Sequence, residues 1–233
     1  MTTVILVHGA FAGSDSWNGV IAALHPEQRV IAYANPLRGI DDDVAPLNDL
    51  IRTIDGPIVL VGHSYGGAVL TAVDPSAAQI VGLVYVAGFA LQTGESPATA
   101  SALAPGSTLA DTLVEVPLQG GGVDLYIDQD EYWKQFCADL SEQQAGSMAV
   151  TQRPVTGAGL NDPLKTPALW QSVPSWFVFG ENDRNIPAAA HHVMADRAGA
   201  RRTVEVAGAS HVVGISHPGE VVTMVMEAAS SPR

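Results

Sequence analysis

The 233-residue sequence contains a single cysteine, Cys137, which excludes an intrachain disulfide. Chains without disulfides are typical of reducing compartments. No basic segment with an apolar stretch behind it precedes the first apolar run at residues 3–7, so we see no secretory signal. We therefore expect a cytoplasmic protein.

Basic residues are scarce. The chain has 11 Lys and Arg against 24 Asp and Glu, a formal net charge of −13. Such an acidic balance disfavours binding to nucleic acid or to an anionic membrane surface. Long apolar runs of the length that spans a bilayer are also missing, so we expect no membrane partner. The composition leaves open whether the chain forms a homodimer.

Apolar residues are abundant, at 47% of the chain, and they fall into short runs separated by helical patterns. Strands are expected at residues 3–7, 29–33, 58–61, 80–87, 175–180 and 202–206. Strands that alternate with helices predict an α/β fold: a doubly wound, mostly parallel sheet of about six strands. Functional groups then gather in loops at the carboxyl ends of the strands.

The alternation stops between residues 88 and 170. That stretch shows turn signals and short helical patterns, the clearest at residues 130–138 and 141–151. We interpret it as a helical cap inserted after the fourth strand, into a core formed by residues 1–87 and 171–233.

A G-x-S-x-G pattern follows the third strand and opens a helix. Gly62 and Gly66 flank Ser64, the arrangement of a nucleophile elbow, in which a strained turn exposes the serine hydroxyl. The amide of Tyr65, at the helix N-terminus, is placed to donate to an oxyanion. The pattern alone also fits an ordinary capping serine, so the assignment depends on a base and an acid elsewhere.

His211 is the expected base, because it lies a few residues past the last strand among small residues. The expected acid is Asp183, in the loop after the fifth strand, with Glu181 as the alternative. The amide of Ala10 is expected to be the second oxyanion donor, with that of Phe11 in reserve. Five other histidines have different expected roles. His8 and His63 are expected to make local hydrogen bonds, and His217 to begin a helix. His191 and His192 are expected on a helix surface, where adjacent residues point in different directions and make a poor metal pair.

Aromatic residues make up only 6% of the chain, and several of them fall near the expected site. The candidates for pocket walls are Phe11, Phe89, Tyr126, Trp133 and Phe136, although each of them, taken singly, is more typical of core packing. Apolar walls favour small or medium uncharged esters over long lipids or anions.

Four segments together resemble the α/β-hydrolase superfamily, in the branch of small bacterial carboxylesterases related to plant methyl esterases and hydroxynitrile lyases. They are HGAF, GHSYGG, GENDRNIP and GASHVVGISHP. The order Ser64, Asp183, His211 is that of the family's catalytic triad. The resemblance implies a serine esterase that needs no metal or organic cofactor and works by two-step acyl transfer.

The same resemblance extends to enzymes with a different reaction. The lyases of this family place Thr where this chain has Gly9, and Lys where it has Val212, which argues against cyanohydrin cleavage. An amidase, a lyase on the same triad, or a ligand-binding receptor that keeps the triad remain open. Cys137 as the nucleophile is a remote alternative, because no elbow surrounds it.

Overall fold

The computed structural model describes residues 2–231 and contains a six-stranded, fully parallel sheet with strand order β2-β1-β3-β4-β8-β9. The strands are β1 (Thr3–Val7), β2 (Arg29–Tyr33), β3 (Pro57–His63), β4 (Gln79–Val86), β8 (Ser175–Gly180) and β9 (Arg202–Val206). The predicted fold class is confirmed, and all six predicted strands are present. β3 runs further than expected, through His63 to the residue before Ser64.

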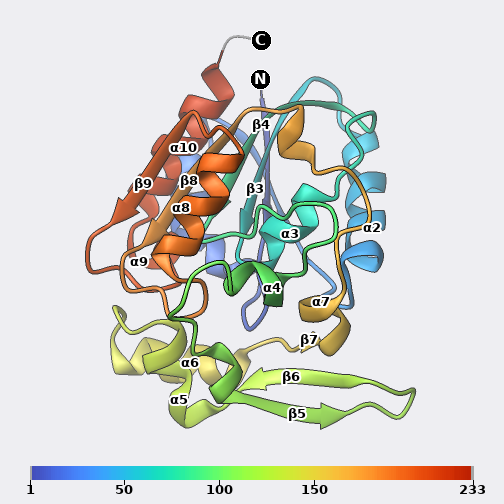
Figure 1. The fold of residues 1–233 in the computed structure, drawn as a ribbon. Helices are drawn as coiled ribbons and strands as arrows, with labels where there is room; N and C mark the ends of the chain where they lie inside the picture. Colours follow the sequence, from blue (N-terminus) through green and yellow to red (C-terminus); the bar gives the residue numbers. More distant parts are fainter. Residues whose placement is uncertain (1, 232–233) are drawn as a thin grey trace.

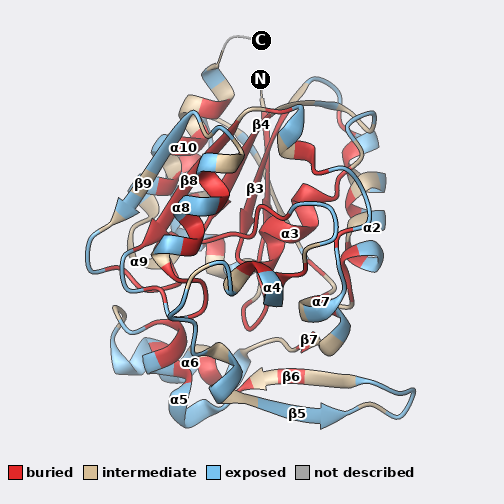
Figure 2. Ribbon diagram, in the orientation of Figure 1, coloured by how far each residue is buried: buried red, intermediate tan, exposed pale blue. Residues whose placement is uncertain are grey.

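Burial follows the position of each strand in the sheet. β1 and β8 are buried along their whole length and β3 at every residue after Pro57, whereas the edge strands β2 and β9 are partly exposed (Figure 2). Central strands of a parallel sheet are covered on both faces, which explains their continuous runs of branched apolar residues. The core of the molecule therefore lies around β1, β3, β8 and the carboxyl-terminal part of β4.

Helices cover both faces of this sheet (Figure 1). One face carries α1 (Asn18–Leu24), which begins directly after the 3-10 turn η1 (Ser14–Trp17), together with α9 (Val213–Ser216) and α10 (Pro218–Ser230). The other face carries α2 (Ile40–Arg52), α3 (Tyr65–Thr71) and α8 (Ala188–Arg197). The carboxyl ends of the strands all point toward the segment that joins β4 to β8 (Figure 1).

That connecting segment, residues 87–174, is called the inserted segment below. Its elements are α4 (Pro97–Ser101), η2 (Leu109–Thr112), β5 (Leu113–Pro117), β6 (Val123–Ile127), α5 (Gln129–Phe136), α6 (Glu142–Thr151), β7 (Val155–Thr156), α7 (Gly157–Asn161) and η3 (Leu169–Gln171). The two expected helices correspond to α5 and α6. The division of the chain into a core and a cap at residues 88 and 170 stays a prediction.

A three-stranded antiparallel sheet, in the order β5-β6-β7, makes the expectation of a purely helical cap incomplete. β5 is mostly exposed, with Val114 and Val116 each 44% accessible to solvent (Figure 2). An exposed hairpin strand lacks the run of buried residues by which a core strand is recognised, so the sequence pattern did not reveal it. Across residues 2–231, the helices are all too short or too polar to cross a membrane.

Candidate active site

Ser64 occupies a strained turn between β3 and α3. Its backbone φ is +51°, in the left-handed region that residues other than glycine rarely adopt, and its side chain is nearly buried. The turn is closely packed: a Cβ at Gly66 would lie 2.2 Å from the carbonyl oxygen of Val7. Glycine at 66 therefore lets α3 start directly against the end of β1, with Ser64 at the apex.

His211 and Asp183 form a buried pair in the loops after β9 and β8. His211 Nδ1 lies 2.7 Å from Asp183 Oδ2, and both side chains are fully buried. Because a carboxylate only accepts, Nδ1 must carry the proton, and Nε2 of the neutral ring is then the unprotonated nitrogen. Within residues 2–231, that Nε2 is buried and has no hydrogen-bond partner.

Asp183 is held on both oxygens. Oδ1 accepts the backbone N–H groups of Asn185 and Ile186 at 2.8 and 2.9 Å. Burial by itself would raise the pKa of Asp183, but the electrostatic interaction with His211 and the ring N–H groups of His191 and His211 outweigh burial and hold that pKa well below its usual range. The group is therefore an ionised carboxylate with a fixed orientation toward His211.

His63, the neighbour of Ser64 in the chain, brings the elbow and the His211 loop together. Its Nε2 donates to the carbonyl oxygen of His211 at 3.1 Å, and the two ring centroids are 4.9 Å apart. Burial, with the neighbouring His211, lowers the pKa of His63 to about 3, so this ring is neutral near pH 7. The sequence predicted a local hydrogen bond for His63, whereas its partner lies 148 residues further along the chain.

His8 fixes the loop after β1 in a similar way. Its Nδ1 donates to the carbonyl oxygen of Gly9 at 2.8 Å, and its Nε2 accepts from the amide of Asn35 at 3.1 Å and from the Arg153 guanidinium at 3.0 Å. Burial, aided by the charge of Arg153, lowers the pKa of His8 to about 4. This neutral ring ties the loop to β2 and to the inserted segment.

The backbone of Phe11 is already occupied on both sides. Its N–H donates to the carbonyl oxygen of Arg153 at 2.9 Å, and its carbonyl oxygen accepts the Tyr132 hydroxyl at 2.7 Å. In the described chain, the amides of Ala10 and Tyr65 make no such bond. Of the two expected donors in this loop, Ala10 is therefore the one whose N–H is free.

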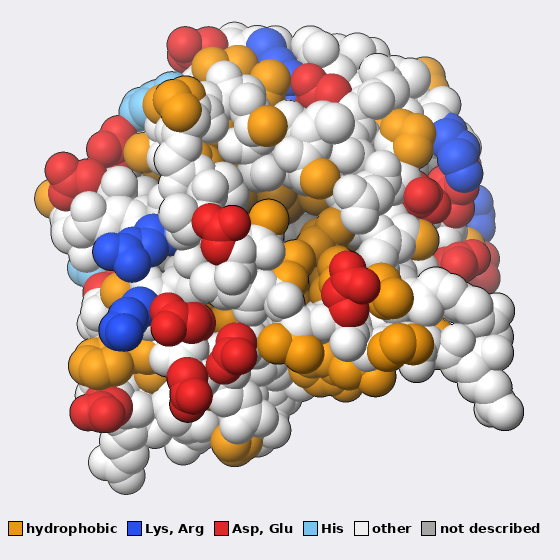
Figure 3. Space-filling model, turned by 60° about the horizontal axis from the view of Figure 1, so that its bottom comes forward, with side chains coloured by type: hydrophobic (Ala, Val, Ile, Leu, Met, Phe, Trp, Pro, Cys, Tyr) orange, Lys and Arg blue, Asp and Glu red, His pale blue; other side chains and the backbone are white. Residues whose placement is uncertain are grey.

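A cavity of about 210 Å³ contains Ser64, Ala10 and Tyr65 in its wall. Among the described residues that line it, none carries a charge; the polar ones besides these are Ser101, Ser107, Asn161 and Asn185. On the face that carries the inserted segment, Figure 3 shows a hollow near the centre with hydrophobic side chains around it. The site is therefore small, largely apolar and uncharged.

Two of the five expected aromatic walls line this cavity, Phe11 and Phe89. Tyr126 belongs to β6, where its neighbour Leu125 faces the cavity; strand alternation turns Tyr126 to the opposite side. Trp133 is 36% exposed and donates its indole N–H to the Leu140 carbonyl oxygen. The structure thus places neither of them at the pocket wall.

Phe136, the fifth expected wall residue, is fully buried beneath the site. Its ring lies 5.2 Å from that of His211 and 6.2 Å from that of Phe11, centroid to centroid. It packs against His211 and the loop after β1 instead of lining the cavity. Sequence spacing could not separate these roles, because a helix face near the site can point into a pocket or into a core.

A larger hollow of about 630 Å³ lies on the other side of Phe11, between η1 and α6. Its described lining includes Phe11 and Tyr132 but does not include Ser64. This hollow has the larger volume, but its described lining contains neither the strained Ser64 nor the buried His211–Asp183 pair. It also lacks Ala10 and Tyr65, which carry the free amides.

The expectation that His191 belongs to a helix surface is wrong. His191 is fully buried on the inner side of α8, and its Nε2 lies 3.3 Å from Asp183 Oδ2. Its neighbour His192 is exposed, as expected, and pairs with Glu205. The sequence does not show which of the two histidines is buried, because α8 is only weakly amphipathic and its pattern does not define the buried face.

Glu181 and Cys137, the second candidates for the acid and the nucleophile, lie in surroundings that disfavour those roles. Glu181 is exposed and accepts the backbone N–H of Gly208 at 2.8 Å, so it is engaged away from His211. Cys137 is buried, and burial raises the pKa of its thiol to about 12. A thiol in that environment stays protonated, which makes it a poor nucleophile.

Asp43, on α2, is a site residue that no sequence motif marks. It is fully buried and accepts the Tyr65 hydroxyl at 2.7 Å, together with the backbone N–H of Arg38 at 2.9 Å. Burial raises the pKa of Asp43. Because Tyr65 carries one of the free amides, Asp43 anchors that residue from behind. In the sequence it is hidden within three consecutive aspartates.

Comparisons with known proteins place the chain among hydrolases. Residues 4–224 match the sequence model of the alpha/beta hydrolase family. Norfluorocurarine synthase 2 of Strychnos sp is 28% identical over an alignment of 254 residues, gaps included, which spans 96% of this chain and 93% of that protein. Methylesterase 8 of Arabidopsis thaliana is 26% identical over an alignment of 228 residues, which spans 89% of this chain and 82% of that protein.

The solved structure of polyneuridine aldehyde esterase superposes on this chain with a TM-score of 0.81 at 19% sequence identity. The match covers 99% of this chain and 100% of that one. At this identity, the likeness establishes the arrangement of the elements.

Proposed function

The chain belongs to the alpha/beta hydrolase family, and from this premise we propose that it is a serine esterase for small or medium uncharged carboxylic esters. The observation that carries the proposal is the buried hydrogen bond between His211 Nδ1 and Asp183 Oδ2, at 2.7 Å. Within residues 2–231 it leaves His211 Nε2 without a partner, and the carbonyl oxygen of His211 contacts His63, the residue next to Ser64. Relatives that are named as esterases support ester hydrolysis as the reaction type.

In the first step, Ser64 Oγ attacks the ester carbonyl carbon while His211 Nε2 takes its proton. The carbonyl π bond opens, and the charge on its oxygen is received by the amides of Ala10 and Tyr65. Asp183 holds His211 in the tautomer that leaves Nε2 free and stabilises the imidazolium. The oxyanion then re-forms the carbonyl bond, the C–O bond to the alkoxy group breaks, and His211 gives its proton to the departing oxygen, which leaves as the alcohol.

In the second step, water attacks the acyl-enzyme. His211 Nε2 takes a proton from this water, the same two amides receive the oxyanion, and the bond between the acyl carbon and Ser64 Oγ breaks. The proton on His211 returns to Ser64, and the carboxylic acid leaves. No metal or organic cofactor is required by these steps.

The substrate class follows from the cavity that contains Ser64. Its walls are Phe11 and Phe89 with side chains from α4, η2 and β6, and its volume is about 210 Å³. An uncharged, mainly apolar wall gives no compensation for the desolvation of an anionic acyl group. Short neutral esters therefore fit, and charged or long-chain esters fit poorly.

The proposal is tested with p-nitrophenyl acetate, butyrate and octanoate. We expect rapid turnover by the wild-type protein, a fall toward octanoate, and loss of roughly 10⁴-fold or more in kcat for Ser64→Ala. Cys137→Ser is the matched control and should keep the activity, because that thiol is buried and protonated.

Equal activity in Ser64→Ala and wild type would refute the assignment of the nucleophile. Tight binding of an ester with almost no turnover would favour a receptor. Release of an aldehyde from a cyanohydrin would favour a lyase.

A further inference from the structure

Two histidines share one oxygen of Asp183. His211 reaches Oδ2 at 2.7 Å from the loop after β9, and His191 reaches the same atom at 3.3 Å from α8. All three side chains are fully buried. Because Oδ1 is bound to the amides of Asn185 and Ile186, each carboxylate oxygen receives two donors, and the group has no freedom to rotate.

His191 makes this bond as a neutral ring. A ring nitrogen that faces a carboxylate must be the protonated one, so Nε2 donates and Nδ1, which has no partner within residues 2–231, is left unprotonated. The ring also stacks on Phe179, at 4.6 Å between centroids and 15° between planes. Burial lowers the pKa of His191, so near pH 7 it supplies a hydrogen bond without a positive charge.

The titratable groups around this cluster include Asp139, whose carboxylate accepts the hydroxyl of Ser210, the residue before His211. Those that act on His191 are Asp183, His211 and, from its own helix, His192. His63 lies against the other side of His211. Burial keeps His63 neutral as well, so the negative charge of Asp183 is shared between two ring N–H groups, of which one belongs to the proposed base.

We propose that His191 is a positioning residue that shares the Asp183 carboxylate with His211 and thereby limits how strongly this carboxylate stabilises the His211 imidazolium. The inference rests on the proposed function, in which Asp183 orients His211. A carboxylate oxygen that accepts a second hydrogen bond offers less charge to the first donor. Loss of the His191 hydrogen bond should therefore strengthen the interaction between Asp183 and His211.

The test separates the hydrogen bond of His191 from its packing. His191→Met fills a similar volume without a donor, whereas His191→Gln retains an N–H group at comparable reach. His192→Gln is the control, because His192 is the neighbouring histidine on α8 but is exposed and paired with Glu205. The readout is the pH midpoint of the His211 ring signals in ¹H–¹⁵N NMR, which follows the folded protein and needs no turnover.

We expect the His211 midpoint to move to higher pH by roughly 0.5–1 unit in His191→Met, the size expected for loss of one ordinary hydrogen bond. His191→Gln and His192→Gln should remain close to wild type. An unchanged midpoint in His191→Met would overturn the proposal. An equal shift in His191→Gln would also overturn it, because packing would then be responsible.

The acid limb of the kcat/KM profile for p-nitrophenyl acetate provides the second readout. It should move in the same direction in His191→Met. If the NMR midpoint moves but the wild-type protein shows no hydrolysis that depends on Ser64, the proposed function fails and the shared carboxylate stands. If hydrolysis depends on Ser64 but neither midpoint moves, the proposed function stands and the shared carboxylate fails.

Discussion

At the scale of single residues, Gly9 shows how closely the site is packed. A Cβ at this position would lie 2.7 Å from Ser64 Cβ and 2.8 Å from the His63 carbonyl oxygen. Neither neighbour can move easily, because Ser64 and His63 belong to the elbow. A glycine here lets the loop that carries the Ala10 amide approach the proposed nucleophile.

We therefore predict that Gly9→Ala lowers kcat by roughly 10²-fold or more, through displacement of Ser64 or of the neighbouring oxyanion amide. Gly146→Ala is the matched control, because no atom lies within 4 Å of a Cβ at that position in α6. It should keep full activity. Ester hydrolysis by the two purified variants decides the matter, and comparable rates would show that the loop does not contact the reacting centre.

The sequence supplied some of these residues and not others, for physical reasons. Ser64 is marked by its flanking glycines, and Asp183 and His211 by their position after strands. His191 and Asp43 carry no such mark, because their roles depend on which face of a helix is buried. The roles of the proposed triad itself stay predictions until the variants are measured.

At the scale of elements, Arg197 at the end of α8 ties the start of the inserted segment to the core. Its guanidinium makes two bonds to Glu95, at 2.7 and 2.6 Å, and one to the carbonyl oxygen of Ala90, also at 2.6 Å. Both side chains are mostly buried. α4 follows directly and contributes Pro97 to the cavity wall, so this bridge also sets the position of the pocket.

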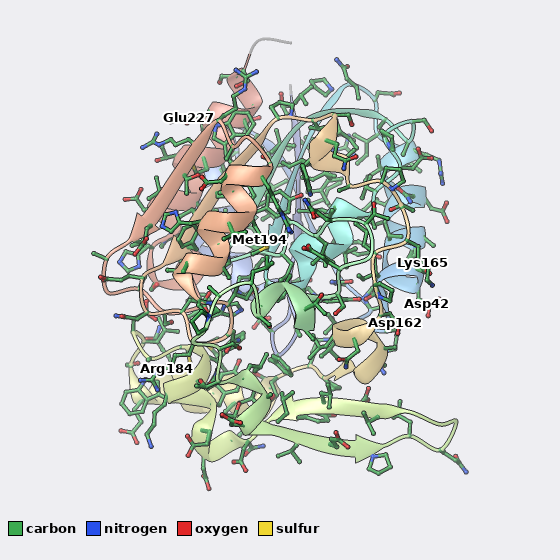
Figure 4. The ribbon with its side chains drawn as sticks, viewed as in Figure 1. Asp42, Asp162, Lys165, Arg184, Met194 and Glu227 are labelled. Carbon is green, nitrogen blue, oxygen red and sulfur yellow. The ribbon has the colours of Figure 1, made fainter. Side chains whose placement is uncertain are left out.

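Arg197→Lys should lower the free energy of unfolding by roughly 1–3 kcal/mol, because an ammonium group cannot reproduce the planar fork. Arg202→Lys, which alters the exposed pair with Glu227 on α10 (Figure 4), is the matched control and should change it by less than about 0.5 kcal/mol. Urea unfolding of both variants tests this. Equal losses would mean that the Glu95 bridge adds no more than a surface pair.

The elements differ in how well their sequence predicted them. The inner strands of the large sheet are continuous apolar runs because both of their faces are covered, whereas the edge strands β2 and β9 are partly exposed; all six match predicted strands. The hairpin of β5 and β6 has one exposed strand, and β7 has only two residues, so neither has a usable pattern. The helices α5 and α6 were found because their apolar residues recur at helical spacing.

At the scale of the whole molecule, the fold encloses three histidines whose pKa is lowered, His8, His63 and His191. Burial, as the main cause, lowers the pKa of His8 to about 4, that of His63 to about 3, and that of His191 in the same direction. Unfolding returns each ring to water, where an imidazole titrates near about 6.5. Below that pH the unfolded chain binds more protons than the folded one, so stability falls as the pH falls.

We predict that the free energy of unfolding drops between pH 6 and pH 4, by at most about 4 kcal/mol per pH unit if all three rings take up a proton only on unfolding. The raised pKa of Asp43 works in the opposite direction and offsets part of this slope. His191→Gln keeps a donor but cannot be protonated, so its slope should be shallower by about 1.4 kcal/mol per pH unit. A wild-type stability that is flat from pH 7 to pH 4 would show that the buried rings do not titrate on unfolding.

Figure 3 shows acidic side chains on the face that carries the hollow, although none of the described residues that line the cavity carries a charge. Arg184 lies where the loop after β8 meets α5, and Lys165 lies with Asp42 and Asp162 beside α2 and α7, whereas Met194 faces the interior from α8 (Figure 4).

The resemblance carried by the four sequence segments was confirmed at the level of the family. Substrate identity belongs to the cavity wall, whose residues come from an insertion that sequence patterns describe poorly.

Acylation of Ser64 can be observed by mass spectrometry of the protein quenched in acid during turnover of p-nitrophenyl acetate. We predict one acetyl group on the peptide that contains Ser64, and none on that peptide in Ser64→Ala. Hydrolysis that proceeds at the wild-type rate with an acetyl group on another residue, or with none on Ser64, would refute the proposed acyl-enzyme mechanism.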